Sequence, residues 1–156
     1  MTAEEGIMKF TKILFPTDFT EGALAAVPYA VDMAKSYGAK LCLLYVIYDM
    51  SATTGLQVPH ASLDAMYEEM QKGSEREIGN FGAGIREGLK DVETKVIRGV
   101  PYEEILNFAA ENAIDLIIMG THGRSGLDRV IFGSTAEKVV RHSDCPVLTV
   151  RATKGK

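Results

Sequence analysis

The chain has 156 residues, of which 46% are hydrophobic and 24% charged, and this length and composition predict one globular domain over residues 1–156. Its formal net charge of −4, with lysines and arginines scattered along the chain, argues against a nucleic-acid-binding surface. The longest apolar run, residues 41–48, is far too short to span a membrane.

A strand and a helix are predicted in the first forty residues. Residues 12–15 form a short apolar run, which predicts a buried strand. Thr20 can cap the helix that follows, with Glu21 in its first turn, and small apolar residues recur at helical spacing as far as Gly38. Pro28 removes one hydrogen bond inside this helix and is expected to kink it.

The next segment is predicted to contain a strand, a loop and a long helix. Residues 41–47 are almost continuously apolar, which is typical of a strand buried on both faces of a parallel sheet. Residues 48–60 are expected to form a loop. Apolar residues then recur every three or four positions over residues 63–85, which predicts an amphipathic helix. We expect this helix to fray or bend at its glycines, because each is about 1 kcal/mol less favourable than alanine in a helix. These are Gly73, Gly79, Gly82 and Gly84.

The last part of the chain is predicted to add three strands and two helices. Residues 93–98 alternate in polarity, which indicates a strand near the edge of a sheet. Pro101 suits the first turn of a helix. Residues 116–119 are read as a fourth strand, residues 135–142 as the last helix and residues 146–150 as a fifth strand.

Strands that alternate with helices predict an α/β fold with right-handed crossovers. The fold class expected is a single doubly wound domain, with a five-stranded parallel sheet in the order 3-2-1-4-5 and helices on both faces. Residues 1–9 and 151–156 are expected to be loose ends.

Distinctive residues follow the first and the fourth predicted strands. Asp18 comes just after the first strand, and Gly120 comes just after the fourth. In doubly wound sheets, ligands bind beyond the carboxyl ends of the strands, where the strand order reverses. If these two strands are neighbours, Asp18 and Gly120 meet at one crevice.

A glycine pattern follows the fourth strand and precedes the last helix. It reads Gly120-Thr-His-Gly123, then nine residues, then Gly133-Ser134-Thr135. Unpaired amides and the dipole at a helix start attract phosphate, and glycines let the main chain approach a ligand closely. The chain contains neither the P-loop motif nor the dinucleotide fingerprint after its first strand. A lone Gly-x-x-Gly also occurs in RNA-binding KH domains, but the acidic charge and the five-strand pattern argue against that class.

The spacing of these residues resembles the Gly-2X-Gly-9X-Gly-Ser/Thr signature of the universal stress protein family, in its ATP-binding branch. The resemblance covers nearly the whole chain. It includes Pro16-Thr-Asp18 at the end of the first strand and the closing segment 142–150. That family has the five-stranded parallel sheet inferred above and commonly forms dimers.

The resemblance implies an ATP site. Asp18 would meet the ribose hydroxyls or the base, Val46 would give main-chain contacts to adenine, and Gly120 would line the ribose. The phosphates would lie against the glycine pattern, with Arg124 either pairing with them or facing water. Mg²⁺ would be held only through the phosphates, because the sequence shows no dedicated carboxylate cluster. The full predicted set of site residues is Pro16, Asp18, Val46, Met119, Gly120, Gly123, Arg124, Gly133, Ser134 and Thr135.

Structural roles remain open for several of these side chains. Asp18 could cap the first helix, Ser134 could cap the last, and the loop glycines could serve turns alone. Capping by Ser134 is compatible with phosphate binding. His122 could contact phosphate or simply be solvated. Met66 and Met70 are read as core or interface packing rather than as part of a cofactor site.

The function expected is that of an ATP-binding stress-response protein that acts as a nucleotide-dependent switch or sensor through a dimer. A slow ATP hydrolase and a dimeric adaptor with a vestigial nucleotide loop stay open as alternatives. Neither a P-loop lysine nor a convincing water-positioning residue is present, so dedicated catalysis is not predicted. Two cysteines without a disulfide framework, and no signal-peptide pattern, favour the cytoplasm. The homodimer is expected to form through an edge strand, by residues Pro146, Val147, Leu148, Thr149 and Val150.

Overall fold

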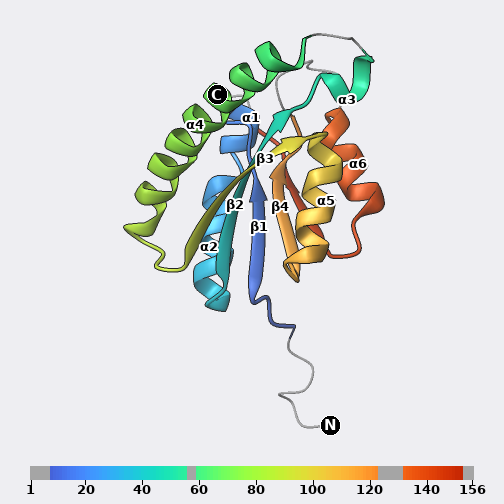
Figure 1. The fold of residues 1–156 in the computed structure, drawn as a ribbon. Helices are drawn as coiled ribbons and strands as arrows, with labels where there is room; N and C mark the ends of the chain where they lie inside the picture. The colour runs from blue at the N-terminus through green and yellow to red at the C-terminus, as the bar shows by residue number, and fades with distance from the viewer. Residues whose placement is uncertain (1–7, 56–58, 123–131, 153–156) are drawn as a thin grey trace.

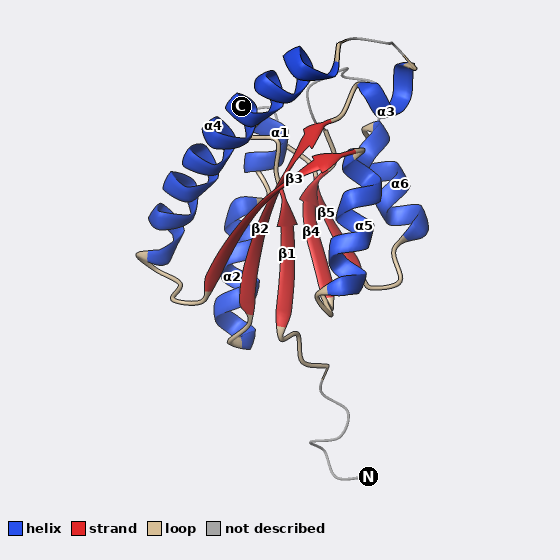
Figure 2. Ribbon diagram, in the orientation of Figure 1, coloured by secondary structure: helices blue, strands red, loops and turns tan. Residues whose placement is uncertain are grey.

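A five-stranded, all-parallel sheet with helices on both faces forms the centre of the fold (Figure 1, Figure 2). The computed structural model describes residues 8–55, 59–122 and 132–152. The strands are β1 Lys12–Pro16, β2 Lys40–Tyr48, β3 Val92–Gly99, β4 Leu116–Gly120 and β5 Val147–Val150. They lie in the order β3-β2-β1-β4-β5, so β1 is central and β3 and β5 are the edges. The predicted fold class and strand order are confirmed.

The helices of the described residues are α1 Glu21–Leu24, α2 Val27–Tyr37, α3 Ser51–Thr54, α4 His60–Arg86, α5 Pro101–Glu111 and α6 Ser134–His142. Thr20 caps α1 through its side chain, as predicted, and Gly38 ends α2 with φ +62°. The single kinked helix expected here was wrong, because the segment forms two helices. Pro28 lies in the first turn of α2, where a missing N–H removes no helical hydrogen bond.

Helix α4 differs from expectation at its start and along its length. It begins at His60 and follows the short helix α3, so residues 48–60 are not the plain loop that was expected. It then continues to Arg86 through all four of its glycines. Packing against β3 and β2 holds it, and Gly82 lies where a Cβ would be 2.7 Å from the Thr94 methyl carbon. The missing side chain of Gly82 therefore lets the helix lie close to β3.

Two hydrophobic cores lie on opposite faces of the sheet, because successive side chains of a strand point to opposite faces. Ile13 and Phe15 of β1 belong to the core beneath α2 and α4, together with Leu43 of β2. Leu14 and Leu44 belong to the core beneath α5 and α6. The prediction that these strands are buried on both faces is confirmed.

The edge strand β5 pairs with β4 alone among the described strands, and Val147, Leu148 and Thr149 are half-buried.

Both cysteines are free thiols. Cys42 is buried in β2, and burial raises the pKa of its thiol to about 11. Cys145 precedes β5 and is half-buried. None of the described helices is long and apolar enough to cross a membrane.

Candidate functional site

A cavity of about 880 Å³ opens at the carboxyl ends of β1, β2 and β4. This volume falls within the range of about 300–1,000 Å³ that is usual for small-molecule sites. From β1 the chain crosses to β2 on one side, while β4 lies against β1 on the other side. The cavity therefore lies at the switch point of the sheet, where a doubly wound fold binds its ligands.

The cavity brings together every predicted site residue that the structure describes. These are Pro16, Asp18, Val46, Met119, Gly120, Gly133, Ser134 and Thr135. The predicted meeting of Asp18 and Gly120 at one crevice is thus found. Gly123 and Arg124 lie outside the described residues.

Asp18 is held by a tight turn between β1 and α1. Its Oδ1 accepts hydrogen bonds from the Thr20 N–H, at 3.0 Å, and from the Thr20 hydroxyl. Phe19 has a φ of +60°, and its N–H donates to Thr17 Oγ1 at 3.0 Å. Within the described part of the chain, Asp18 Oδ2 accepts no hydrogen bond. The helix cap is Thr20, so Asp18 keeps one carboxylate oxygen available to a ligand.

The main chain of Val46 also faces the cavity, which follows from the hydrogen-bond pattern of β2. The Leu44 carbonyl accepts the Thr17 N–H at 2.9 Å, so Leu44 directs its polar groups toward β1. Alternate residues of a strand direct their N–H and C=O to the same side, so those of Val46 point the same way. Strand β1 ends at Pro16, which leaves the Val46 groups beyond the last β1–β2 pair.

The first turn of α6 supplies amide donors. The Gly133 N–H donates to the Thr121 carbonyl at 2.6 Å, so this amide is already engaged, and a phosphate contact by Gly133 stays a prediction. The N–H groups of Ser134, Thr135 and Ala136 follow it in the first turn, where a helix offers no internal acceptor. Among the described residues they have no other acceptor, so they present a positive helix end to the cavity.

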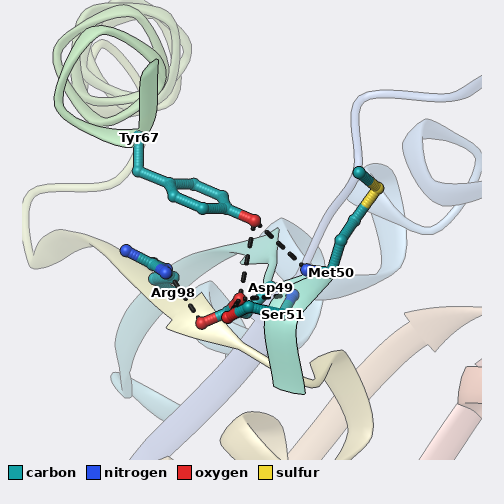
Figure 3. Close-up of polar contacts among 5 residues, drawn as sticks. All are labelled: Asp49, Met50, Ser51, Tyr67 and Arg98. Carbon is teal, nitrogen blue, oxygen red and sulfur yellow. Dashed lines mark hydrogen bonds and ion pairs between the residues drawn. The ribbon is translucent and has the colours of Figure 1, made fainter. Parts of the chain in front are cut away.

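A cluster of five residues lies beside the cavity, and two of them, Met50 and Tyr67, line it; the cluster also contains Asp49, Ser51 and Arg98 (Figure 3). Arg98 of β3 donates to Asp49 Oδ2 at 2.9 Å, and its guanidinium carbon lies 3.6 Å from the centre of the Tyr67 ring. The Tyr67 hydroxyl accepts the Met50 N–H at 3.2 Å, and Ser51 donates to Asp49 Oδ1 through both N–H and hydroxyl. The Ser51 hydroxyl, followed by Arg98, holds the pKa of Asp49 below its ordinary value. These contacts link the end of β2 to β3 and α4 beside the cavity.

Several residues of the lining were not predicted from the sequence. Met66 and Met70 of α4 are 43% and 41% exposed and line the cavity, so core packing was wrong for them, while interface packing stays a prediction. His122 also lines the cavity, with its Nδ1 at 2.8 Å from the Thr121 hydroxyl oxygen. One missed residue had a readable signal, because Lys138 lies four positions after Ser134 on a predicted helix, and hence on the same face. The remaining unpredicted side chains include Tyr45, Tyr48, Met50, Tyr67 and Tyr102.

Comparison with known proteins identifies one family. Residues 9–151 match the universal stress protein family. Universal stress protein MJ0531 of Methanocaldococcus jannaschii is 34% identical over 145 residues, which cover 93% of this chain and 84% of that protein. Universal stress protein YxiE of Bacillus subtilis is 35% identical over 147 residues, covering 91% of this chain and 99% of that protein. The solved structure of universal stress protein UspA from Lactobacillus plantarum has a TM-score of 0.79 at 28% identity, covering 93% of this chain and all of that one.

Proposed function

The chain belongs to the universal stress protein family, and from that premise we propose that it binds an adenine nucleotide, ATP, in the cavity at the carboxyl ends of β1, β2 and β4. One observation carries the proposal. The same cavity holds the Asp18 carboxylate, whose Oδ2 accepts no hydrogen bond from the described residues, and the first-turn amides of α6 from Ser134 on, which find no acceptor among those residues. These are the two chemistries that a ribose and a phosphate chain require.

The nucleoside would occupy the β1 and β2 side of the cavity. Asp18 Oδ2 can accept hydrogen bonds from the two ribose hydroxyls. The Val46 N–H and C=O form a donor–acceptor pair beyond the end of β1, which complements one edge of an adenine base. The tyrosine and methionine side chains around them supply apolar surface for the base, as in most small-molecule sites.

The phosphates would occupy the β4 and α6 side. The amides of Ser134, Thr135 and Ala136 can donate to phosphate oxygens, and the hydroxyls of Ser134 and Thr135 add two more donors. Mg²⁺ would enter with the phosphates, because the described residues contain no cluster of three or more His, Cys, Asp or Glu side chains that could hold a metal ion.

Two fold neighbours support the choice of ligand class. One is a universal stress protein solved in complex with cAMP, with a TM-score of 0.63 at 23% identity, covering 94% of this chain and all of that one. The other is an Arabidopsis thaliana family protein with AMP bound, with a TM-score of 0.59 at 16% identity, covering 92% of each chain. At these identities they share the fold, so the residues of this cavity carry the proposal for this chain.

Calorimetry with ATP, ADP, AMP and cyclic AMP tests the proposal. We expect micromolar binding of at least ATP, which corresponds to about −8 kcal/mol, together with a rise in melting temperature. Absence of both heat and thermal stabilisation for all four nucleotides would favour the adaptor function instead. Mass spectrometry of any small molecule that co-purifies with the protein provides an independent check.

We also propose that nucleotide binding acts as a switch through a homodimer formed by β5. The outer edge of this strand leaves backbone groups for a second copy to pair with; residues 147–150 form the strand, and Pro146 comes just before it. Light scattering after size exclusion tests this part separately, with a dimer expected at micromolar concentration. A monomer at that concentration would contradict the dimer while leaving nucleotide binding untouched.

A further inference from the structure

Lys138 is the single lysine or arginine in the described lining of the cavity. It lies on α6, four residues after Ser134, which also lines the cavity. Residues four apart share one face of a helix, and long helical side chains lean toward the helix N-terminus. The Lys138 side chain therefore extends along the face that carries the first-turn donors.

The ammonium of Lys138 has an aromatic contact in place of an ion pair. Its Nζ lies 4.6 Å from the centre of the Tyr102 ring, and Tyr102 lines the same cavity from α5. Within the described part of the chain, no carboxylate pairs with Lys138. Its neighbour Glu137 instead pairs with Arg141, at 2.9 Å. The ring keeps a full positive charge beside the cavity without neutralising it.

The charges of the cavity lining make a cation such as Lys138 favourable for binding a nucleotide. In the described lining the one carboxylate is Asp18, and Lys138 offsets it. A nucleotide would bring several further negative charges into this space. A hydrogen bond between an ammonium and a phosphate oxygen is charge-assisted and stronger than contact with an exposed ring face.

We propose that Lys138 binds the phosphate chain of the nucleotide, and that it makes affinity depend on the number of phosphates. The inference rests on the function proposed above and adds a charged side chain that helps to tell ATP from adenosine. Tyr102 holds the ammonium next to the cavity, and the ammonium moves from the ring to phosphate when nucleotide binds.

The test compares Lys138→Gln with Arg141→Gln, which removes the same charge from an exposed position on the same helix. Affinities for ATP, AMP and adenosine are measured by calorimetry at low salt, with thermal unfolding as a check on folding. We expect Lys138→Gln to weaken ATP binding by about tenfold, the usual size for one charged hydrogen bond. Adenosine affinity should stay within about twofold, and Arg141→Gln should behave as wild type.

The outcomes separate this inference from the proposed function. If the wild-type protein binds ATP and Lys138→Gln binds ATP with the same affinity, the role of Lys138 is overturned and the proposed function stands. An equal loss for adenosine and ATP would also overturn it, because the residue would then act on the shape of the cavity. Wild-type protein that binds none of the three ligands would overturn the proposed function, and this inference with it.

Discussion

Gly22 in α1 and Gly120 at the end of β4 pack backbone against backbone. A Cβ on Gly120 would lie 2.7 Å from the Gly22 carbonyl carbon and closer still to its oxygen. A Cβ on Gly22 would in turn lie 3.0 Å from the His122 carbonyl carbon. The two glycines let α1 rest directly on the strand end, which brings the turn of Asp18 beside β4. Gly120 therefore has a packing role in addition to lining the cavity.

We predict that Gly120→Ala destabilises the protein, because backbone atoms cannot move aside as a flexible side chain can. The expected loss is about 1–3 kcal/mol in the free energy of unfolding, as for overpacked cores. Urea denaturation measures it. The matched control is Gly79→Ala in α4, where φ is not positive and, in the described structure, nothing beyond the adjoining residues and the helix's own backbone lies within 4 Å of the added Cβ. That variant should gain about 0.5–1 kcal/mol. Equal effects of the two substitutions would contradict the packing argument.

The sequence predicted the strands and the position of the cavity because both depend on local pattern and on a general rule of topology. Apolar runs marked β1, β2 and β4, and the switch-point rule placed Asp18 beside Gly120. The continuity of α4 could not be predicted from propensity alone. Its glycines weaken an isolated helix, but contact with β3 and β2 supplies the stabilisation that propensity lacks.

The cluster of Asp49 and its partners beside the cavity had no signal in the sequence. Asp49 and Arg98 are brought together by the register of β2 and β3, in which Ile47 lies opposite Arg98. Tyr67 reaches them from α4, a separate element. Neither strand register nor helix placement can be read from residue spacing, so this cluster became visible only in the structure.

We predict that Asp18→Ala abolishes the preference of the site for a ribonucleoside. Removing the carboxylate removes the acceptor proposed for the ribose hydroxyls, so ATP affinity should fall by about tenfold or more. The effect should be smaller for 2′-deoxy-ATP, which offers one hydroxyl fewer, and calorimetry with both ligands measures the difference. Asp18→Asn is the control for folding, because its amide oxygen can still accept from Thr20. An equal loss of affinity for ATP and 2′-deoxy-ATP would show that the ribose does not lie against Asp18.

Gly133→Val probes the phosphate side of the cavity. The backbone at Gly133 is extended, with φ −68° and ψ 163°, so valine can adopt it without strain. Gly133 lines the cavity, and a branched side chain there should fill space needed by phosphate. We expect ATP binding to be lost while thermal unfolding stays cooperative and the melting temperature changes little. Unchanged ATP affinity would place the phosphates elsewhere.

The Asp49 cluster should make the free energy of unfolding depend on pH in the acidic range. Hydrogen bonds from Ser51, and then Arg98, lower the pKa of Asp49 in the folded protein. A carboxyl whose pKa is lowered by folding stabilises the protein above its unfolded pKa of about 3.9, and this contribution is lost as the pH falls through the folded value. Wild type should therefore exceed Asp49→Asn in stability at pH 7 by up to about 1 kcal/mol.

This difference should shrink steadily below about pH 4 and vanish in stronger acid, where both side chains are neutral. Urea denaturation of both proteins between pH 7 and pH 2 measures it. Glu137→Gln is the control, because it breaks the exposed pair with Arg141 and should change stability by only a few tenths of a kcal/mol at any pH. A gap between wild type and Asp49→Asn that stays constant across this range would show that asparagine disturbs the packing of Met50 and Tyr67, and that the charge of Asp49 plays no part.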